Sequence, residues 1–216
     1  MIRAVIFDMD GLLVDSEPVW DRSRSEMATL YGKPWGEEDH RAIMGVNSRE
    51  WAAYMIKRLE LSMSSEEVQS YIVGKVAQNY QQRIPFLPGA VEAVQLAAQN
   101  FPIGLASGSH RDLIDLVLDH PALRGKFQVI LSADEVAKGK PAPDVYLEAA
   151  QRMGYSPETC VCLEDSTNGI LAGKRAGMKV ISVPSSLFPP SPELLAQVDL
   201  RLDSLSELTL EMLQSL

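Results

Sequence analysis

Short runs of apolar and β-branched residues alternate with longer amphipathic segments over much of the chain. Several runs are apolar almost throughout, as strands covered on both faces must be. The runs that predict strands are residues 2–7, 103–106, 129–131, 160–163 and 180–183. The segments between them that predict helices are residues 90–100, 113–119, 145–153 and 169–176. Because such helices suit right-handed crossovers, the pattern predicts an α/β fold with a doubly wound parallel sheet.

One interval, residues 16–84, lacks this alternation. It contains helical patterns and no run that predicts a strand, and it is too long for a loop. We therefore expect an α-helical cap domain over residues 16–84, inserted into a core domain made of residues 1–15 and 85–216. The end of the chain, from Val198, predicts an edge strand and a final helix.

Length and charge narrow the class of protein. A chain of 216 residues with 46% hydrophobic content can bury a core without disulfides or a structural metal. The net charge of −9 disfavours nucleic acid and anionic membrane as partners. The sequence has no secretory leader pattern and no apolar run as long as a membrane span. We expect a cytoplasmic monomer. A small phosphorylated ligand remains compatible, because a local pocket can outweigh a distant, screened acidic surface.

Two carboxylates, Asp8 and Asp10, follow the first predicted strand directly, and Gly11 permits a tight turn after them. In an open α/β sheet the carboxyl ends of the strands are where ligands bind. Two acids so close repel each other, and a cation between them relieves the repulsion. On their own they are equally well explained as turn formers or helix caps.

Polar residues follow the other predicted strands at the same edge. Glu164 and Asp165 form a second acidic pair, and two converging pairs are costly without a metal. The hydroxyl and amides at Ser107 and Gly108 can hold an anionic oxygen, although taken alone this segment is better explained by an N-cap at Ser107 or Ser109. Lys140 lies in a proline-rich loop, where it can neutralise a phosphate or a carboxylate.

Taken together, these motifs resemble the haloacid dehalogenase (HAD) superfamily, and the resemblance covers nearly the whole chain. The four motifs occur in order as Asp8-Met9-Asp10-Gly11, Ser107, Lys140, and Glu164-Asp165 followed by Gly169. A match of four motifs in register is far more specific than any one of them. Further similarity, in Asp15-Ser16-Glu17-Pro18, Lys140-Pro141-Ala142-Pro143 and Leu163-Glu164-Asp165-Ser166, points to the subgroup of sugar-phosphate phosphatases and β-phosphoglucomutase.

The resemblance implies a Rossmann-like core with a small helical cap, and a Mg²⁺-dependent phosphatase that hydrolyses a small phosphorylated metabolite, first of all a sugar phosphate. It implies that Asp8 attacks phosphorus to form an aspartyl phosphate, and that Asp10 acts as general acid and then as general base. The implied Mg²⁺ ligands are Asp8, the main chain of Asp10, Asp165, and Glu164 directly or through water.

The implied phosphate-binding groups are Ser107, the amide of Gly108, and Lys140, which stabilise charge on the transferring oxygens. In the cap, Arg49 and Lys75 match, by approximate alignment, positions that touch substrate in related enzymes. For both, a solvated position on a helix is the more common explanation.

Two other functions remain open. One is a sugar phosphomutase, because the core motifs are the same and only the fate of the aspartyl phosphate differs. In β-phosphoglucomutase a cap histidine follows the first motif, and Trp20 stands there in this chain. The other is a phosphate-binding protein without catalysis, although none of the four motifs is impaired. Glu17, Trp20 and Asn47 are further candidates for recognising a sugar, whereas the three histidines match no ligand spacing.

Overall fold

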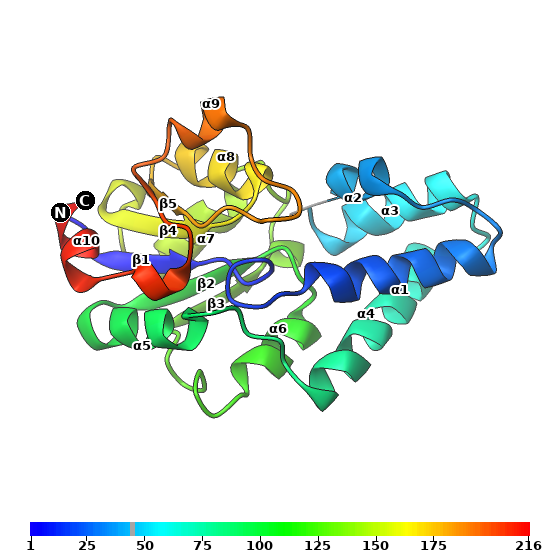
Figure 1. Cartoon of the computed structure of the whole chain (residues 1–216), viewed down its shortest axis with the longest axis horizontal. Coiled ribbons are helices and arrows are strands. Elements are labelled where there is room, and N and C mark those ends of the chain that lie inside the picture. The colour runs from blue at the N-terminus through cyan, green and yellow to red at the C-terminus, as the bar shows by residue number, and fades with distance from the viewer. Residues whose placement is uncertain (44–45) are drawn as a thin grey trace.

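A computed structural model describes residues 1–43 and 46–216. Its centre is one six-stranded parallel sheet with the strand order β3-β2-β1-β4-β5-β6 (Figure 1). The strands are β1 Ala4–Phe7, β2 Ile103–Ser107, β3 Val129–Ser132, β4 Cys160–Glu164, β5 Lys179–Ser182 and β6 Leu200–Arg201. The order reverses between β1 and β4, so that the carboxyl ends of these two strands flank the crevice where open α/β sheets bind ligands.

Each face of the sheet buries its own apolar cluster. Successive side chains of a strand point to opposite faces, so Ile6 joins one cluster and Phe7 the other. One face is covered by α5 Ala90–Asn100, α6 Arg111–Leu118 and α10 Leu210–Ser215. The other is covered by α7 Asp144–Met153, α8 Thr167–Arg175 and α9 Pro192–Leu195. Burial on both sides explains why the strands are apolar almost throughout.

Four helices lie beside the carboxyl end of the sheet (Figure 1). They are α1 Glu17–Leu30, α2 Glu37–Ile43, α3 Ser48–Leu59 and α4 Ser65–Gln82. Helix α4 packs against both α1 and α3, and α2 packs against α3. The starts of α3 and α4 are set by capping boxes at Asn47 and Ser64, each of which satisfies otherwise unpaired amides.

The two connections between these helices and the sheet run side by side. The Asp15 amide donates to the Pro85 carbonyl at 2.8 Å, and the Leu87 amide donates to the Leu13 carbonyl at 3.0 Å. The helices therefore leave and rejoin the sheet at one place. Their treatment as a separate cap domain over residues 16–84 remains a prediction.

The predicted α/β fold with its doubly wound parallel sheet is confirmed. The strands differ from the prediction only at their ends: β1 begins at Ala4 rather than at residue 2, and β5 spans Lys179–Ser182 rather than residues 180–183. Strands β2, β3 and β4 each run one residue further than predicted. The added residues are polar and fully buried, namely Ser107, Ser132 and Glu164. A prediction from apolar runs stops before these polar residues. They can be buried only because residues of other segments pair with them.

Among the described residues, no helix combines the length and the apolar character needed to cross a lipid bilayer.

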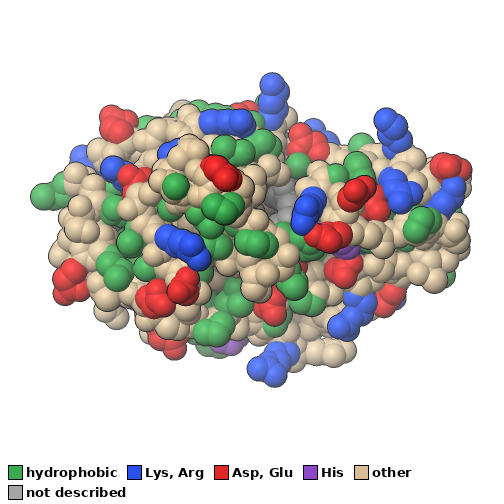
Figure 2. Space-filling model, turned by 45° about the horizontal axis from the view of Figure 1, so that its top comes forward, with side chains coloured by type: hydrophobic (Ala, Val, Ile, Leu, Met, Phe, Trp, Pro, Cys, Tyr) green, Lys and Arg blue, Asp and Glu red, His purple; other side chains and the backbone are tan. Residues whose placement is uncertain are grey.

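Acidic and basic side chains are interspersed on the face of the molecule shown in Figure 2. The charge of −9 therefore does not form a field of a single sign over this face. Attraction of an anionic ligand has to come from local groups.

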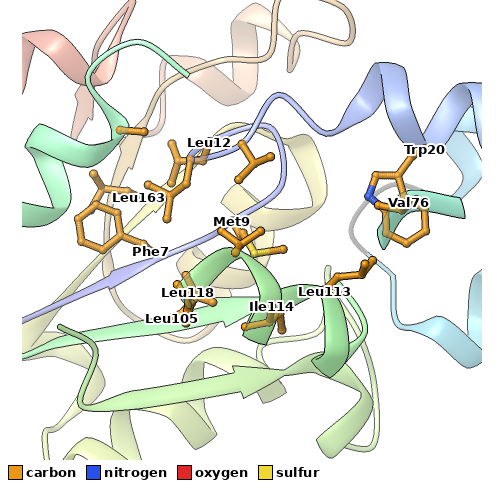
Figure 3. Packing of buried hydrophobic residues seen from close by; sticks show 14 of the residues in the cluster. Phe7, Met9, Leu12, Trp20, Val76, Leu105, Leu113, Ile114, Leu118 and Leu163 are labelled. Atoms are coloured by element: carbon orange, nitrogen blue, oxygen red, sulfur yellow. The ribbon is translucent and has the colours of Figure 1, made fainter. Parts of the chain in front are cut away.

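The interior of the larger cluster yields a test of the fold. Leu105 is fully buried on β2, where it is turned toward the same interior as Phe7 and Leu118 (Figure 3). Replacing it with alanine leaves a cavity, so Leu105→Ala should lower the free energy of unfolding by about 2–5 kcal/mol in urea denaturation. Leu30→Ala is the control, because Leu30 is 70% exposed and its loss should change stability by less than about 0.5 kcal/mol. Equal losses in the two variants would contradict this assignment of the core.

Candidate active site

Two acidic pairs meet at the carboxyl edge of β1 and β4. The strands pair with Phe7 opposite Leu163, and the Asp8 amide extends the ladder by donating to the Leu163 carbonyl at 3.1 Å. This register brings Asp8, directly after β1, level with Glu164, the last residue of β4. Backbone pairing therefore places carboxylates that are more than 150 residues apart in sequence on neighbouring strands.

A buried lysine joins these carboxylates. The Lys140 ammonium donates to Asp8 Oδ1 at 2.6 Å, to Glu164 Oε1 at 2.6 Å and to the Ala106 carbonyl at 3.1 Å. These three contacts use all three of its protons. Burial alone would lower the pKa of Lys140, but the facing carboxylates of Asp8 and Glu164 raise it above its usual range. Lys140 is therefore a permanent cation that fixes the orientation of Asp8.

Glu164 is held from a second side. The Tyr146 hydroxyl, from α7, donates to the same Oε1 atom that Lys140 contacts. The Tyr146 ring also lies 4.9 Å from the Lys140 ammonium, within cation–π range. Glu164 is fully buried, so these donors replace water around it.

Three carboxylates cluster closely enough to share one cation. Oxygen atoms of Asp8, Glu164 and Asp165 lie within 4.8 Å of one another, and all three residues are buried. Burial is the largest influence on Asp8 and, against the pull of Lys140, raises its pKa to about 8. Burial, followed by the neighbouring Glu164 and Asp8 carboxylates, raises the pKa of Asp165 as well.

Three buried carboxylates facing one ammonium leave an excess of negative charge. Either protons or a divalent cation can relieve it. The donor atoms are all oxygens, which Mg²⁺ prefers, and the cluster lies at the cavity described below. The residues present therefore fit a magnesium ion.

Two glycines make room for these carboxylates. A side-chain carbon at Gly11 would lie 2.1 Å from Asp165 Oδ2, and Gly11 has a φ of +76°. A side-chain carbon at Gly169, within α8, would lie 1.8 Å from Glu164 Oε2. Only a residue without Cβ fits at either position. The sequence pattern of acids followed by glycine thus has a steric cause.

Asp10 accepts hydrogen bonds from both sides of the site. The Ser109 hydroxyl donates to Oδ2 at 2.6 Å and the Ser107 hydroxyl at 3.2 Å. From α1, the Trp20 indole N–H donates to Oδ1 at 3.2 Å. The carboxylate of Asp10 is thus oriented jointly by the β2 edge and by a helix of the predicted cap.

A cavity of about 430 Å³ opens over these groups, between the sheet edge and the helices α1 to α3. This volume is typical of sites for small molecules. The predicted site residues that line it are Asp8, Asp10, Gly108, Lys140 and Asp165. The Ser107 hydroxyl and the Glu164 carboxylate lie just beneath the lining, where they hold Asp10 and Lys140.

Arg49 and Lys75 lie elsewhere. Arg49 is exposed and donates to the Asp134 carbonyl, where the start of α3 meets the loop after β3. Lys75 pairs with Glu26 at 3.4 Å and lines a separate shallow pocket. Neither is among the described residues that line the cavity. Their part in substrate binding remains a prediction.

Among the residues of the lining that were not assigned a role from the sequence are Arg24, His40 and Phe188. His40 pairs with Asp21 at 2.5 Å and stacks on Phe188. Arg24 comes four residues after Trp20, so the two share one side of α1. Because Trp20 was already a candidate for recognising a sugar, this spacing could have indicated from the sequence that Arg24 also faces the ligand.

Comparison with known proteins gives consistent results. The family model described as haloacid dehalogenase-like hydrolase matches residues 2–177. The chain is 37% identical to hexitol phosphatase B of Escherichia coli, over 96% of this chain and 95% of that protein. It is 34% identical to the phosphorylated carbohydrates phosphatase of Thermotoga maritima, over 83% and 84% of the two chains.

Among solved structures, the fold matches CbbY from Rhodobacter sphaeroides with a TM-score of 0.87 and 27% identity. The alignment covers 99% of this chain and 100% of the CbbY chain, which was solved in complex with phosphate. A mutant of the same protein, solved with xylulose-(1,5)bisphosphate, matches equally well.

The glycine cradle under Glu164 can be tested by stability. Gly169→Ala should lower the free energy of unfolding by about 1–3 kcal/mol, because the added methyl group displaces the buried carboxylate. Gly74→Ala, in the middle of α4, is the matched control: nothing lies within 4 Å of the added carbon, and the exchange should raise stability by up to about 1 kcal/mol. Thermal or urea unfolding of both variants measures the contrast. A stabilised Gly169→Ala protein would contradict the described packing.

Proposed function

Because this chain belongs to the haloacid dehalogenase-like hydrolases, we propose that it hydrolyses a small sugar phosphate or sugar-alcohol phosphate through a Mg²⁺-dependent reaction with an aspartyl-phosphate intermediate. It is an enzyme of the phosphatase type, as its relatives named hexitol phosphatase and phosphorylated carbohydrates phosphatase support. The observation that carries the finer proposal is the salt bridge of Lys140 to Asp8 at the floor of the cavity.

Asp8 is the nucleophile in this proposal. Lys140 holds one of its carboxylate oxygens, and Asp8 lines the cavity, so the carboxylate is oriented before the substrate binds. A carboxylate oxygen of Asp8 forms a bond to phosphorus while the bond from phosphorus to the sugar oxygen breaks. Asp10 gives a proton to the departing oxygen, which leaves as the sugar hydroxyl.

In the second step a water molecule replaces the sugar. Asp10, now ionised, takes a proton from the water as its oxygen bonds to phosphorus, and the bond between phosphorus and Asp8 breaks. The products are inorganic phosphate and the original Asp8 carboxylate. Ser107, Ser109 and Trp20 keep Asp10 in place through both steps, because all three donate to its carboxylate.

Asp8, Asp165 and Glu164 would hold the magnesium ion, together with the Asp10 main-chain carbonyl that the family resemblance adds. When bound, Mg²⁺ neutralises negative charge on the phosphoryl group and on the clustered carboxylates. Lys140 neutralises part of the same charge through its ion pair with Asp8.

Trp20, the residue of α1 that contacts Asp10, favours transfer of the phosphoryl group to water rather than to a second sugar hydroxyl. By the family resemblance, Trp20 stands at the position of the histidine of β-phosphoglucomutase, and its indole N–H, which donates to Asp10, can only donate. It therefore cannot serve as a second proton acceptor for a sugar hydroxyl.

The nucleophile assignment predicts the behaviour of Asp8→Asn. With glucose 6-phosphate, glucitol 6-phosphate and an aryl phosphate as substrates, the wild type should release inorganic phosphate without forming an isomeric sugar phosphate. Asp8→Asn should lower kcat by more than roughly a thousandfold, because no covalent intermediate can form. Asp112→Asn, at an exposed position on α6, is the control and should retain wild-type rates. Phosphate release by a well-folded Asp8→Asn protein would reject Asp8 as the nucleophile.

The raised pKa of Asp8 predicts that protons compete with the metal. A pKa of about 8 means that the carboxylate of the metal-free protein holds a proton below that pH and loses it above. The half-saturating Mg²⁺ concentration should therefore fall as pH rises from 6 to 8, by up to about tenfold per pH unit for each proton displaced. Calorimetric Mg²⁺ titrations across this range measure the trend, and chelation of Mg²⁺ should stop phosphate release. Equal Mg²⁺ affinity at pH 6 and pH 8 would show that no proton is displaced.

A further inference from the structure

The cavity contains a cation that the reaction does not use. Arg24 of α1 lines the end of the cavity formed by the predicted cap. Its guanidinium carbon lies 4.7 Å from the ring centroid of Trp20 and 5.8 Å from that of Trp51. Both indoles are buried, at 7% and 2% exposure, and Trp20 packs beside Val76 of α4 (Figure 3). The guanidinium is therefore held against a fixed aromatic wall.

Within the described part of the chain, no carboxylate lies within ion-pairing distance of the Arg24 guanidinium. Its Nε atom is buried and makes no hydrogen bond, and none of the ion pairs within 4.0 Å involves this side chain. Neighbouring cap residues are paired: Asp21 contacts His40 at 2.5 Å, and Arg58 contacts Asp39 at 2.7 Å. A buried donor without an acceptor is costly, and it is exceptional in native proteins.

Arg24 keeps its charge all the same. Burial lowers its pKa to about 10, against the opposing carboxylates of Asp10, Asp21 and Glu17. At neutral pH the side chain is therefore a cation in a place that disfavours charge. An anion in contact with the guanidinium would offset the cost of burying this charge, whereas a neutral hydroxyl would accept its hydrogen bonds without pairing the charge.

Trp20 relates this cation to the reacting groups. Its indole N–H donates to Asp10, while its ring faces the Arg24 guanidinium. Asp10 and the Arg24 guanidinium are thus both in contact with the same indole, that of Trp20. A five- or six-carbon chain that carries its reacting phosphate at Asp8 would present its other end near Arg24, and a cavity of about 430 Å³ has room for both.

We propose that Arg24 binds a second anionic group of the substrate, a carboxylate or a second phosphate, at the end remote from the phosphate that is hydrolysed. This inference rests on the proposed phosphatase function and deepens it by naming the substrate class, a doubly anionic sugar phosphate. A guanidinium suits this task because its planar fork donates two parallel hydrogen bonds to a carboxylate or a phosphate.

The test compares three probes of one carbon skeleton: glucose 6-phosphate, 6-phosphogluconate and glucose 1,6-bisphosphate. The wild type should show a kcat/KM at least tenfold higher for one or both doubly anionic probes than for glucose 6-phosphate. Which of the two is preferred separates a carboxylate from a phosphate. Arg24→Gln should lower that preference tenfold or more, and Arg24→Lys should restore part of it, because lysine keeps the charge without the fork.

Arg22→Gln is the matched control. Arg22 belongs to the same helix, but it is exposed and lies outside the lining of the cavity, so the wild-type preference should persist. A wild type that prefers glucose 6-phosphate would overturn the proposal. So would an Arg24→Gln variant that loses the same factor on all three probes and on an aryl phosphate, because that result indicates a structural role.

Binding without turnover separates this proposal from the proposed function. In the Asp8→Asn background, calorimetry should show that Arg24→Gln weakens the doubly anionic probes tenfold or more and weakens glucose 6-phosphate much less. This selective loss would support the role of Arg24 even if the wild type released no phosphate. Unchanged affinity for the doubly anionic probes would overturn the role of Arg24 even if the hydrolysis itself is confirmed.

Discussion

The site depends on one buried ammonium, that of Lys140, which lies between Asp8 and Glu164. These three residues come from three separate parts of the chain, so the contact forms only when β1, β4 and the loop before α7 are all in place. Removing the ammonium would leave two adjacent buried carboxylates with no cation, which costs far more than losing a surface ion pair. The carboxylates of Asp8 and Glu164 and the ammonium of Lys140 therefore come together only when this edge of the sheet has folded.

The parallel sheet can hold this cluster of like charges because its strands supply rigid positions at which carboxylates can meet. Backbone pairing fixes Asp8 and Glu164, and the missing side chains at Gly11 and Gly169 let the acids approach without a clash. What remains is an excess of negative charge, which protons relieve in the metal-free protein and a divalent cation relieves in the proposed enzyme. The same geometry thus explains both the raised pKa of Asp8 and the fit to magnesium.

The sequence indicates the placement of the core residues more directly than that of the cap residues, for a physical reason. A strand covered on both faces is a continuous apolar run, and the residue after it must lie at the carboxyl edge, so Asp8 and Asp165 could be placed without coordinates. A basic residue on a helix carries no such information, because most are solvated. A part of Arg49 and Lys75 in substrate binding remains a prediction. Arg24, which was not assigned a role from the sequence, lines the cavity, because the rotation of α1 against the sheet depends on tertiary packing.

This difference follows from how the two halves of the site are held. The reacting groups are fixed by strand register, whereas Arg24 is held by the indoles of Trp20 and Trp51 on helices that join the sheet through two adjacent connections. Trp20 also donates to Asp10, so the side chain that packs against Arg24 also orients Asp10, the proposed proton donor. A substrate that draws Arg24 and its indole wall into place would at the same time hold Asp10 in its reacting position. Recognition of the far end of the substrate and readiness for proton transfer are then mechanically coupled, and a ligand too short to reach Arg24 would lack that support.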